Sequence, residues 1–124
     1  MKMKLQTADL RDNALDWAVS KARGLDVSPA DWLKVHRVCT EYSFSSAWET
    51  GGALLEQCVE QGMLIERVDP QYKTLQKFKA TLDRWESVYR ADTLLVAVCR
   101  CYVAAKLGQE VDIPQEVLDL QTAT

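Results

Sequence analysis

The sequence lacks the residues from which most metal and redox sites are built. It contains a single histidine, His36, and its four cysteines include no Cys-x-x-Cys pair. The only ligand-like spacing joins His36 to Cys39, whereas a structural zinc site ordinarily uses two closely spaced pairs. We therefore expect no metal and no cofactor, and we expect free, mostly buried thiols in a reducing compartment.

A long hydrophobic run is also missing. The longest apolar stretch, Leu94 to Ala105, is broken by Arg100 and is too short to span a bilayer. No apolar signal segment follows Met1 to Lys4. These absences predict a cytoplasmic protein that has no membrane partner.

Neither sign of charge dominates the chain. There are 15 Lys and Arg against 18 Asp and Glu, which gives a net charge of −3. General DNA- or RNA-binding proteins need a cationic surplus to displace phosphate counterions, so that class is excluded. A local basic patch stays open at Lys77, Lys79, Arg84 and Arg90, although these residues also fit the solvated face of a strand.

Catalytic and phosphate-binding motifs are absent as well. No Gly-x-x-x-x-Gly-Lys or Gly-x-Gly-x-x-Gly pattern surrounds the glycine pair Gly51-Gly52. A nucleophile needs a base within hydrogen-bond reach, and no Ser–His–acid or Cys–His–acid arrangement can be inferred around the single histidine. We therefore expect a binding protein and not an enzyme.

The residues that are present predict one α+β domain over residues 1–124. With 48% hydrophobic and 27% charged residues, the chain has enough apolar side chains for a core and enough charge for solubility. Three main helices are expected at about 12–23, 47–61 and 93–107, with an antiparallel hairpin at about 63–82. The predicted fold is a small antiparallel sheet flanked by these helices, similar to an α-β-α sandwich.

The ends of the predicted helices carry cap and stop signals. The predicted caps are Asp12, Ser46 and Asp92, and Ser46 forms a capping box with Glu49. Lys21 and Arg23 are predicted in the favourable last turn of the first helix. The predicted stops are Gly24, in the left-handed conformation, Gly62 and Gly108. The third helix is apolar nearly all round, so we expect it to be the central, most buried element.

The segments between the helices are less regular. Residues 25–46 fit either an edge strand at Leu33 to Val38 or a helix starting at Pro29. Residues 85–90 are predicted to form a loop, and the tail leads to one short helical turn through Leu118.

The hairpin is predicted from two strands, 63–68 and 73–82, joined by a turn at 69–71. In the second strand alternate side chains are expected to face opposite sides. The inward set is Phe78, Ala80 and Leu82, and the outward set is Lys77, Lys79 and Thr81.

Two features inside helices need a specific reason. The pair Gly51-Gly52 costs roughly 1 kcal/mol per glycine relative to alanine. This indicates close approach by a ligand, by another element or by a neighbouring subunit. Arg100 needs a partner if it is buried, and the alternatives are a carboxylate such as Asp16, a subunit interface and a ligand phosphate.

Three blocks of sequence resemble the phage NinX family. They lie in the first helix, in the second helix, and at the end of the third helix and beyond. The blocks are Ala14 to Lys21, Trp48 to Glu56, and Cys99 to Gly108 followed by Glu110 to Pro114. The resemblance implies a phage accessory protein in the host cell cytoplasm, from a group of unknown function.

Three shorter pieces are similar to a phage α-β-α sandwich domain: Leu15-Asp16, Tyr42-Ser43 and Ala91-Asp92-Thr93. That domain resembles the anti-Thoeris sponge proteins, oligomers that sequester cyclic ADP-ribose-type signals and in some cases cyclic oligonucleotides. The resemblance implies a homo-oligomer with a nucleotide-derived ligand. Two positions depart from the NinX pattern, with Ala47 in place of the usual Asp and Leu94 in place of the usual Pro. If that Asp contacts a ligand in the family, its absence puts the ligand in doubt here.

Seven residues around the predicted starts of the second and third helices are candidate ligand-binding residues. They are Tyr42, Ser43, Trp48, Trp85, Arg90, Asp92 and Thr93. Aromatic rings there could stack on a base, and a helix start beside Arg90 suits phosphate or ribose hydroxyls. In the structural alternative the rings pack beside the caps and Asp92 is only a cap.

The functional hypothesis is a phage counter-defence protein that sequesters a nucleotide-derived immune signal without catalysis. The alternative is a protein–protein interaction module that binds and modulates a host or phage protein.

Overall fold

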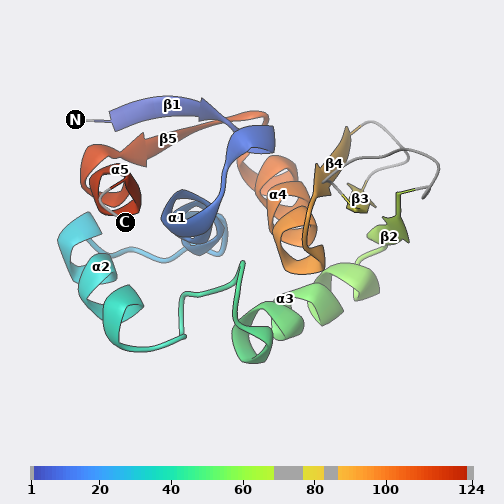
Figure 1. Cartoon of the computed structure of the whole chain (residues 1–124), viewed down its shortest axis with the longest axis horizontal. Coiled ribbons are helices and arrows are strands. Elements are labelled where there is room, and N and C mark those ends of the chain that lie inside the picture. The colour runs from blue at the N-terminus through green and yellow to red at the C-terminus, as the bar shows by residue number, and fades with distance from the viewer. Residues whose placement is uncertain (1, 69–76, 83–86, 123–124) are drawn as a thin grey trace.

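Helices and strands alternate irregularly along the chain. The computed structural model describes residues 2–68, 77–82 and 87–122 (Figure 1). The elements are β1 (Lys2–Gln6), the 3-10 turn η1 (Thr7–Asp9), α1 (Asp12–Ala22), α2 (Pro29–Val38), α3 (Trp48–Glu60), β2 (Leu64–Arg67), β3 (Phe78–Leu82), β4 (Ser87–Ala91), α4 (Leu94–Leu107), β5 (Glu110–Pro114) and α5 (Gln115–Thr122). The helices accompany two small antiparallel sheets, which confirms the predicted α+β class.

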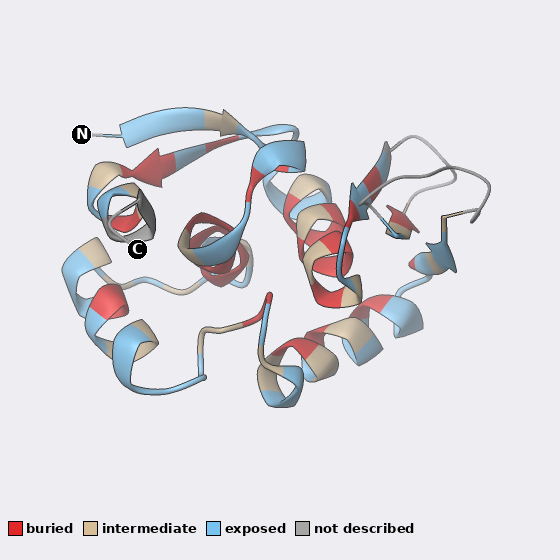
Figure 2. Cartoon of the chain, in the orientation of Figure 1, coloured by how far each residue is buried: buried red, intermediate tan, exposed pale blue. Residues whose placement is uncertain are grey.

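Helix α4 lies at the centre of the molecule. It packs against α1, α3 and strands β3 and β4, and Figure 1 shows it between α1 and the β2–β3–β4 sheet. Seven of its 14 residues are buried, compared with seven of the 11 residues in α1 (Figure 2). The central position agrees with the prediction, but α1 is buried to a larger fraction. Among the described residues, no helix has both the length and the apolar character needed to cross a bilayer.

A two-stranded sheet joins the two ends of the described chain. Strand β1 pairs antiparallel with β5, and the register runs from Lys2 opposite Pro114 to Gln6 opposite Glu110. In β5 the side chains of Val111 and Ile113 are buried, and Asp112 between them is exposed. Neither strand was predicted, because each is only five residues long and its partner lies at the far end of the sequence.

Strands β2, β3 and β4 form the second sheet, in that order. The β2–β3 pairing agrees with the predicted hairpin. The loop predicted at 85–90 is wrong at residues 87–90, because Ser87–Ala91 pairs with β3 as strand β4, and residues 85 and 86 lie outside the described residues. The predicted turn at 69–71 and residues 73–76 lie outside the described residues.

One side of the β2–β3–β4 sheet packs on α4. The inward set of β3, Phe78, Ala80 and Leu82, belongs to the core or packs against it, as predicted. Thr81, predicted to face outward, is also buried, with 4% of its surface exposed. Lys79, assigned to a basic patch or a solvated face, forms an ion pair with Glu66 at 3.3 Å.

Residues 29–38 form helix α2, so the edge strand considered for this segment is wrong. Ser28 Oγ accepts a hydrogen bond from the Asp31 amide at 3.2 Å, and Pro29 takes the first helical position. Trp32 and Leu33 are buried side by side in the sequence, which a helix end accommodates and an alternating strand does not.

The glycine stops are confirmed, and the predicted caps are wrong by one residue each. Gly24, Gly62 and Gly108 have φ values of 87°, 100° and 97°. The observed N-caps are Arg11, Ala47 and Thr93, in place of Asp12, Ser46 and Asp92. Of the three, only Thr93 uses its side chain, with Oγ1 accepting from the Val96 amide at 3.3 Å. Backbone geometry sets the boundary, and sequence signals locate it only to within a residue or two.

Candidate binding site

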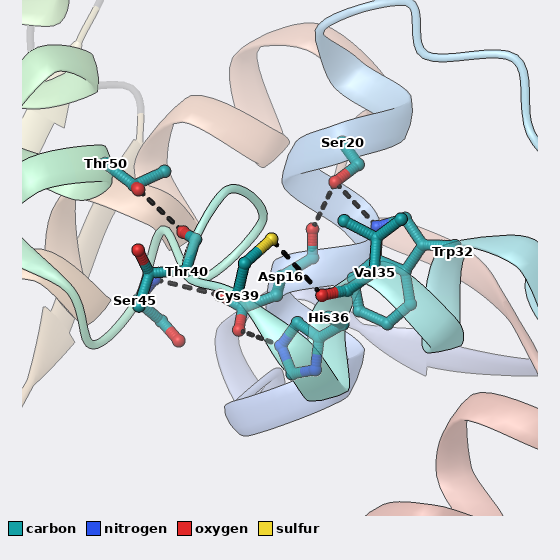
Figure 3. A network of polar contacts seen from close by, with 9 residues as sticks. All are labelled: Asp16, Ser20, Trp32, Val35, His36, Cys39, Thr40, Ser45 and Thr50. Carbon is teal, nitrogen blue, oxygen red and sulfur yellow. Dashed lines mark hydrogen bonds and ion pairs between the residues drawn. The ribbon is translucent and has the colours of Figure 1, made fainter.

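A buried polar network centred on Asp16 holds α1, α2 and the 40–47 segment together. Asp16 lies on α1 and only 3% of its surface is exposed. Its Oδ1 accepts a hydrogen bond from the Ser45 amide at 2.9 Å, and its Oδ2 accepts one from His36 Nε2 at 2.9 Å (Figure 3). Because hydrogen bonds to a buried carboxylate are stronger than neutral ones, this residue fixes the 40–47 segment against the helices.

Trp32 extends the same network and orients an aromatic stack. Its side chain is fully buried, and its indole Nε1 donates to Ser20 Oγ at 3.0 Å. Ser20 Oγ in turn donates to the Asp16 carbonyl oxygen at 3.0 Å (Figure 3). The indole stacks on His36 at 4.5 Å between centroids and on Tyr42 at 5.9 Å. The position of the Tyr42 ring therefore depends on Trp32.

An open cleft lies beside Tyr42, between the end of α1, residues 41–44 and α3. Its volume is about 580 Å³, within the range of small-molecule sites. Its polar lining consists of Ser20, Arg23, Glu41, Tyr42, Glu49, Thr50 and Gln57. Apolar side chains, including Phe44 and Leu54, complete the wall. The cleft thus presents one cation, two carboxylates and several neutral hydrogen-bonding groups to a ligand.

Arg23 is the one cation of this lining. Its Nη1 donates to Gln57 Oε1 at 3.1 Å, and its Cζ lies 5.7 Å from the centroid of the Phe44 ring. Burial raises the pKa of Tyr102, and the charge of Arg23 opposes that shift. A guanidinium carries five N–H donors, so the group held here still has donors for a ligand.

On the opposite wall of the cleft, two threonines connect the 40–47 segment to α3 by hydrogen bonds. Thr40 Oγ1 donates to Glu49 Oε1 at 2.5 Å, and Thr50 Oγ1 donates to the Thr40 carbonyl oxygen at 2.6 Å. Glu49 therefore ties the 40–47 segment to α3, and does not close a capping box on Ser46.

Gly51 permits the close contact behind this wall. A Cβ at Gly51 would collide with the Phe44 carbonyl oxygen and would lie 3.0 Å from both δ-methyl groups of Leu95. Of the reasons considered for the glycine pair, close approach by another element therefore applies to Gly51. Gly52 is different, because the nearest atom to an added Cβ there is Trp48 Cε3 at 3.6 Å, an ordinary contact.

The structure separates the candidate residues identified from the sequence into two groups. In the first group, Tyr42 lines the cleft, Ser43 donates from its amide to the Thr40 carbonyl oxygen at 3.0 Å, and Trp48 is exposed at the start of α3. The second group, at the start of α4, lies outside the cleft lining. Trp85 falls outside the described residues.

The second group has structural contacts of its own. Thr93 caps α4, and the Arg90 carbonyl oxygen accepts a hydrogen bond from Arg100 Nη1 at 2.7 Å. Arg100 Nε also donates to the Leu10 carbonyl oxygen at 2.8 Å. The expected pairing of Arg100 with Asp16 is therefore wrong, because two backbone carbonyls serve as its hydrogen-bond partners. Burial lowers the pKa of Arg100, and the nearby charge of Asp92 opposes this.

Sequence reasoning missed most of the cleft lining. Arg23 was assigned to the favourable last turn of a helix and Glu49 to a capping box, and Gln57 and Glu41 carried no signal. These residues come from three separate parts of the chain, and only the packing of α1, the 40–47 segment and α3 brings them together. No local pattern could have identified the set.

The four thiols are free and mostly buried, as predicted. All four cysteines are free, with Cys39 exposed and Cys58, Cys99 and Cys101 buried. Within the described residues, no group of three or more His, Cys, Asp or Glu side chains is arranged to hold a metal ion. Burial raises the pKa of Cys58 to about 11 and that of Cys99 well above its usual range.

Thiol labelling should follow this difference in burial. At about pH 8, near the ordinary thiol pKa, iodoacetamide is expected to modify Cys39 in the folded protein. Cys58 and Cys99 should react only after denaturation, because both are buried and their raised pKa values keep them protonated. Mass spectrometry of labelled peptides measures this. Modification of Cys58 as fast as that of Cys39 in the folded protein would contradict the structure.

Comparison with known proteins identifies the family of this chain. The family model described as bacteriophage P22 NinX matches residues 6–106. No curated protein and no solved structure matches the chain. The matched span contains every residue that lines the cleft, and it ends before β5 and α5.

Proposed function

Because this chain belongs to the bacteriophage P22 NinX family, we propose that it is a phage accessory protein that binds and sequesters a nucleotide-derived immune signal of the host. The observation that carries the proposal is the cleft beside Tyr42, with Arg23 at one wall and two glutamates in its lining. The distant resemblance to sponge proteins supplies the ligand class.

The chemistry of the lining suits a nucleotide rich in hydroxyl groups. The Arg23 guanidinium can pair with a phosphate through two parallel N–H bonds. Glu41 and Glu49 can accept hydrogen bonds from ribose hydroxyls, as acidic side chains do in dinucleotide sites. Since two carboxylates stand against one cation, a ligand with three or more phosphates, such as a cyclic trinucleotide, would be repelled. Cyclic ADP-ribose-type signals and cyclic dinucleotides both carry two phosphates, but the former have more free ribose hydroxyls for the two glutamates, so the cleft favours the cyclic ADP-ribose type.

Binding without chemical change fits the groups around the cleft. The Thr50 hydroxyl donates to a backbone carbonyl, and the Ser20 hydroxyl also donates to one, so neither is hydrogen-bonded to a base. His36 is engaged by Asp16 and stacked on Trp32. We therefore propose release of the ligand intact, and not its cleavage.

Replacing Arg23 tests the site. We expect the purified chain to bind a cyclic ADP-ribose-type signal in calorimetry, and Arg23→Gln to weaken this binding about tenfold or more, since a charge-assisted phosphate contact is worth roughly 1.5–3 kcal/mol. Arg37→Gln, at an exposed position on α2 outside the cleft, is the matched control and should bind like the parent.

Heating the complex separates sequestration from catalysis. The proposal requires that chromatography recover the ligand unchanged, and measurement of mass in solution tests the accompanying expectation of a homo-oligomer. No binding of cyclic ADP-ribose-type signals or cyclic oligonucleotides would overturn the proposed function. A degraded ligand would overturn the non-catalytic part.

A further inference from the structure

Helix α3 carries an apolar stripe that the described fold covers only in part. Its members are Trp48, Gly52, Leu55 and Val59, spaced so that all four lie on one side of the helix. Trp48 is 60% exposed and Val59 is 51% exposed. Gly52 and Leu55 are half-buried, and one side of Leu55 packs against the core. Figure 2 shows α3 at the edge of the molecule, with exposed and half-buried residues away from α4. We call these four residues the α3 stripe.

Gly52 is an unusual member of the stripe because the fold does not require it. An added Cβ would meet only Trp48 Cε3 at 3.6 Å, and glycine is unfavourable in a helix relative to alanine. Gly51, by contrast, is needed for the Phe44 contact. A glycine kept between exposed apolar side chains leaves room for another backbone to approach closely.

A row of acidic residues follows the stripe. Glu49, Glu56 and Glu60 each stand one position after a stripe residue, so they share a neighbouring line on the helix. Glu56 and Glu60 are exposed, and neither has an ion-pair partner in the described parts of the chain. Helix α3 contains no lysine or arginine to balance them. The surface is therefore apolar along one line and negative along the next.

We propose that the α3 stripe is a docking site for a basic amphipathic helix of another protein. Such a helix would place its apolar anchors on Trp48, Leu55 and Val59, and its lysines or arginines beside the glutamates. A second copy of α3 would add unpaired glutamates and no cation. Anionic membranes and nucleic acids would be repelled by the same row. None of the four stripe residues lines the cleft, and of the acidic row only Glu49 does. The inference rests on the stripe with Glu56 and Glu60, so it does not depend on the proposed ligand.

A peptide-binding experiment tests this directly. The probe is a fluorescent synthetic peptide of leucine and lysine with a single apolar helical face, and its control has the same composition in scrambled order. We expect anisotropy to report binding of the amphipathic peptide only. Trp48→Ala and Val59→Lys should each weaken it about tenfold, as expected for central anchors, and Val38→Ser, at an apolar residue 83% exposed on α2, should not.

Two further variants separate shape from charge. Gly52→Ala should weaken peptide binding while leaving the fold intact, because its added methyl group lies where the partner would approach. The double variant Glu56→Lys with Glu60→Lys should reverse the preference toward a peptide of leucine and glutamate. Equal binding of the scrambled peptide, or unchanged binding by Trp48→Ala and Val59→Lys, would overturn the proposal. So would self-association that is lost in Trp48→Ala, since the occupant would then be a second copy.

Discussion

Gly51→Ala is expected to lower the free energy of unfolding by about 3 kcal/mol, the upper end of the usual cost of adding a methyl group to a packed site. The new Cβ would collide with the Phe44 carbonyl oxygen and press on both δ-methyl groups of Leu95. A backbone oxygen cannot rotate away as the end of a flexible side chain can. The 40–47 segment would have to move, and with it one wall of the cleft. Urea denaturation followed by circular dichroism measures the change.

Gly52→Ala is the matched control for this prediction. It makes the same chemical change one residue later in the same helix, where the nearest neighbour is a ring atom of Trp48 at 3.6 Å. Removing a helical glycine there should raise the stability by up to about 1 kcal/mol. If the two variants changed the free energy of unfolding equally, the contact between Gly51 and the Phe44 carbonyl would be wrong.

Trp32→Ala is expected to have the largest effect of any single substitution considered, a loss of about 4 kcal/mol. The side chain is fully buried, stacks on both His36 and Tyr42, and donates to Ser20 Oγ. Its removal would leave a large cavity and an unsupported Tyr42. The melting temperature and the ligand affinity measured by calorimetry should therefore both fall.

Trp32→Phe separates the hydrogen bond from the packing. A phenyl ring keeps most of the aromatic contact but loses the indole N–H, so the expected cost is about 1–2 kcal/mol, with Tyr42 still supported. Ligand binding should then change less than stability does. A cost as large as that of Trp32→Ala would indicate that the Trp32–Ser20 hydrogen bond dominates, contrary to the geometric argument.

The long helices and their glycine stops could be predicted because their signals are local. The apolar periodicity of α1 and α4, and the positive φ of Gly24, Gly62 and Gly108, need no knowledge of distant residues. Strand β4 and the β1–β5 pair could not be predicted in the same way. Their segments are five residues long, and a partner strand defines them more than their own composition does.

Of the residues that line the cleft, only Tyr42 was predicted as a binding residue. Glu41 and Gln57 carried no signal, and Arg23 and Glu49 each matched a local helix signal. The sequence suggested that an arginine before Gly24 serves the end of α1, and that a glutamate three residues after Ser46 serves the start of α3. In the structure Arg23 donates a hydrogen bond to Gln57 on α3, and Glu49 accepts one from Thr40. Local signals of this kind indicate how a residue stabilises the end of its own helix. The cleft, in contrast, forms only where α1, the 40–47 segment and α3 pack together.

The pairing of β1 with β5 determines when the fold can be completed during synthesis. Gln6 and Glu110 are 104 residues apart in the chain, yet they pair in the sheet. At the usual speed of translation the first strand therefore waits roughly 5–20 s for its partner. All the residues lining the cleft have been made by then. During that interval β1 exposes backbone groups with which another nascent chain can pair, so the emergence of Glu110–Pro114 both closes the fold and removes a route to aggregation.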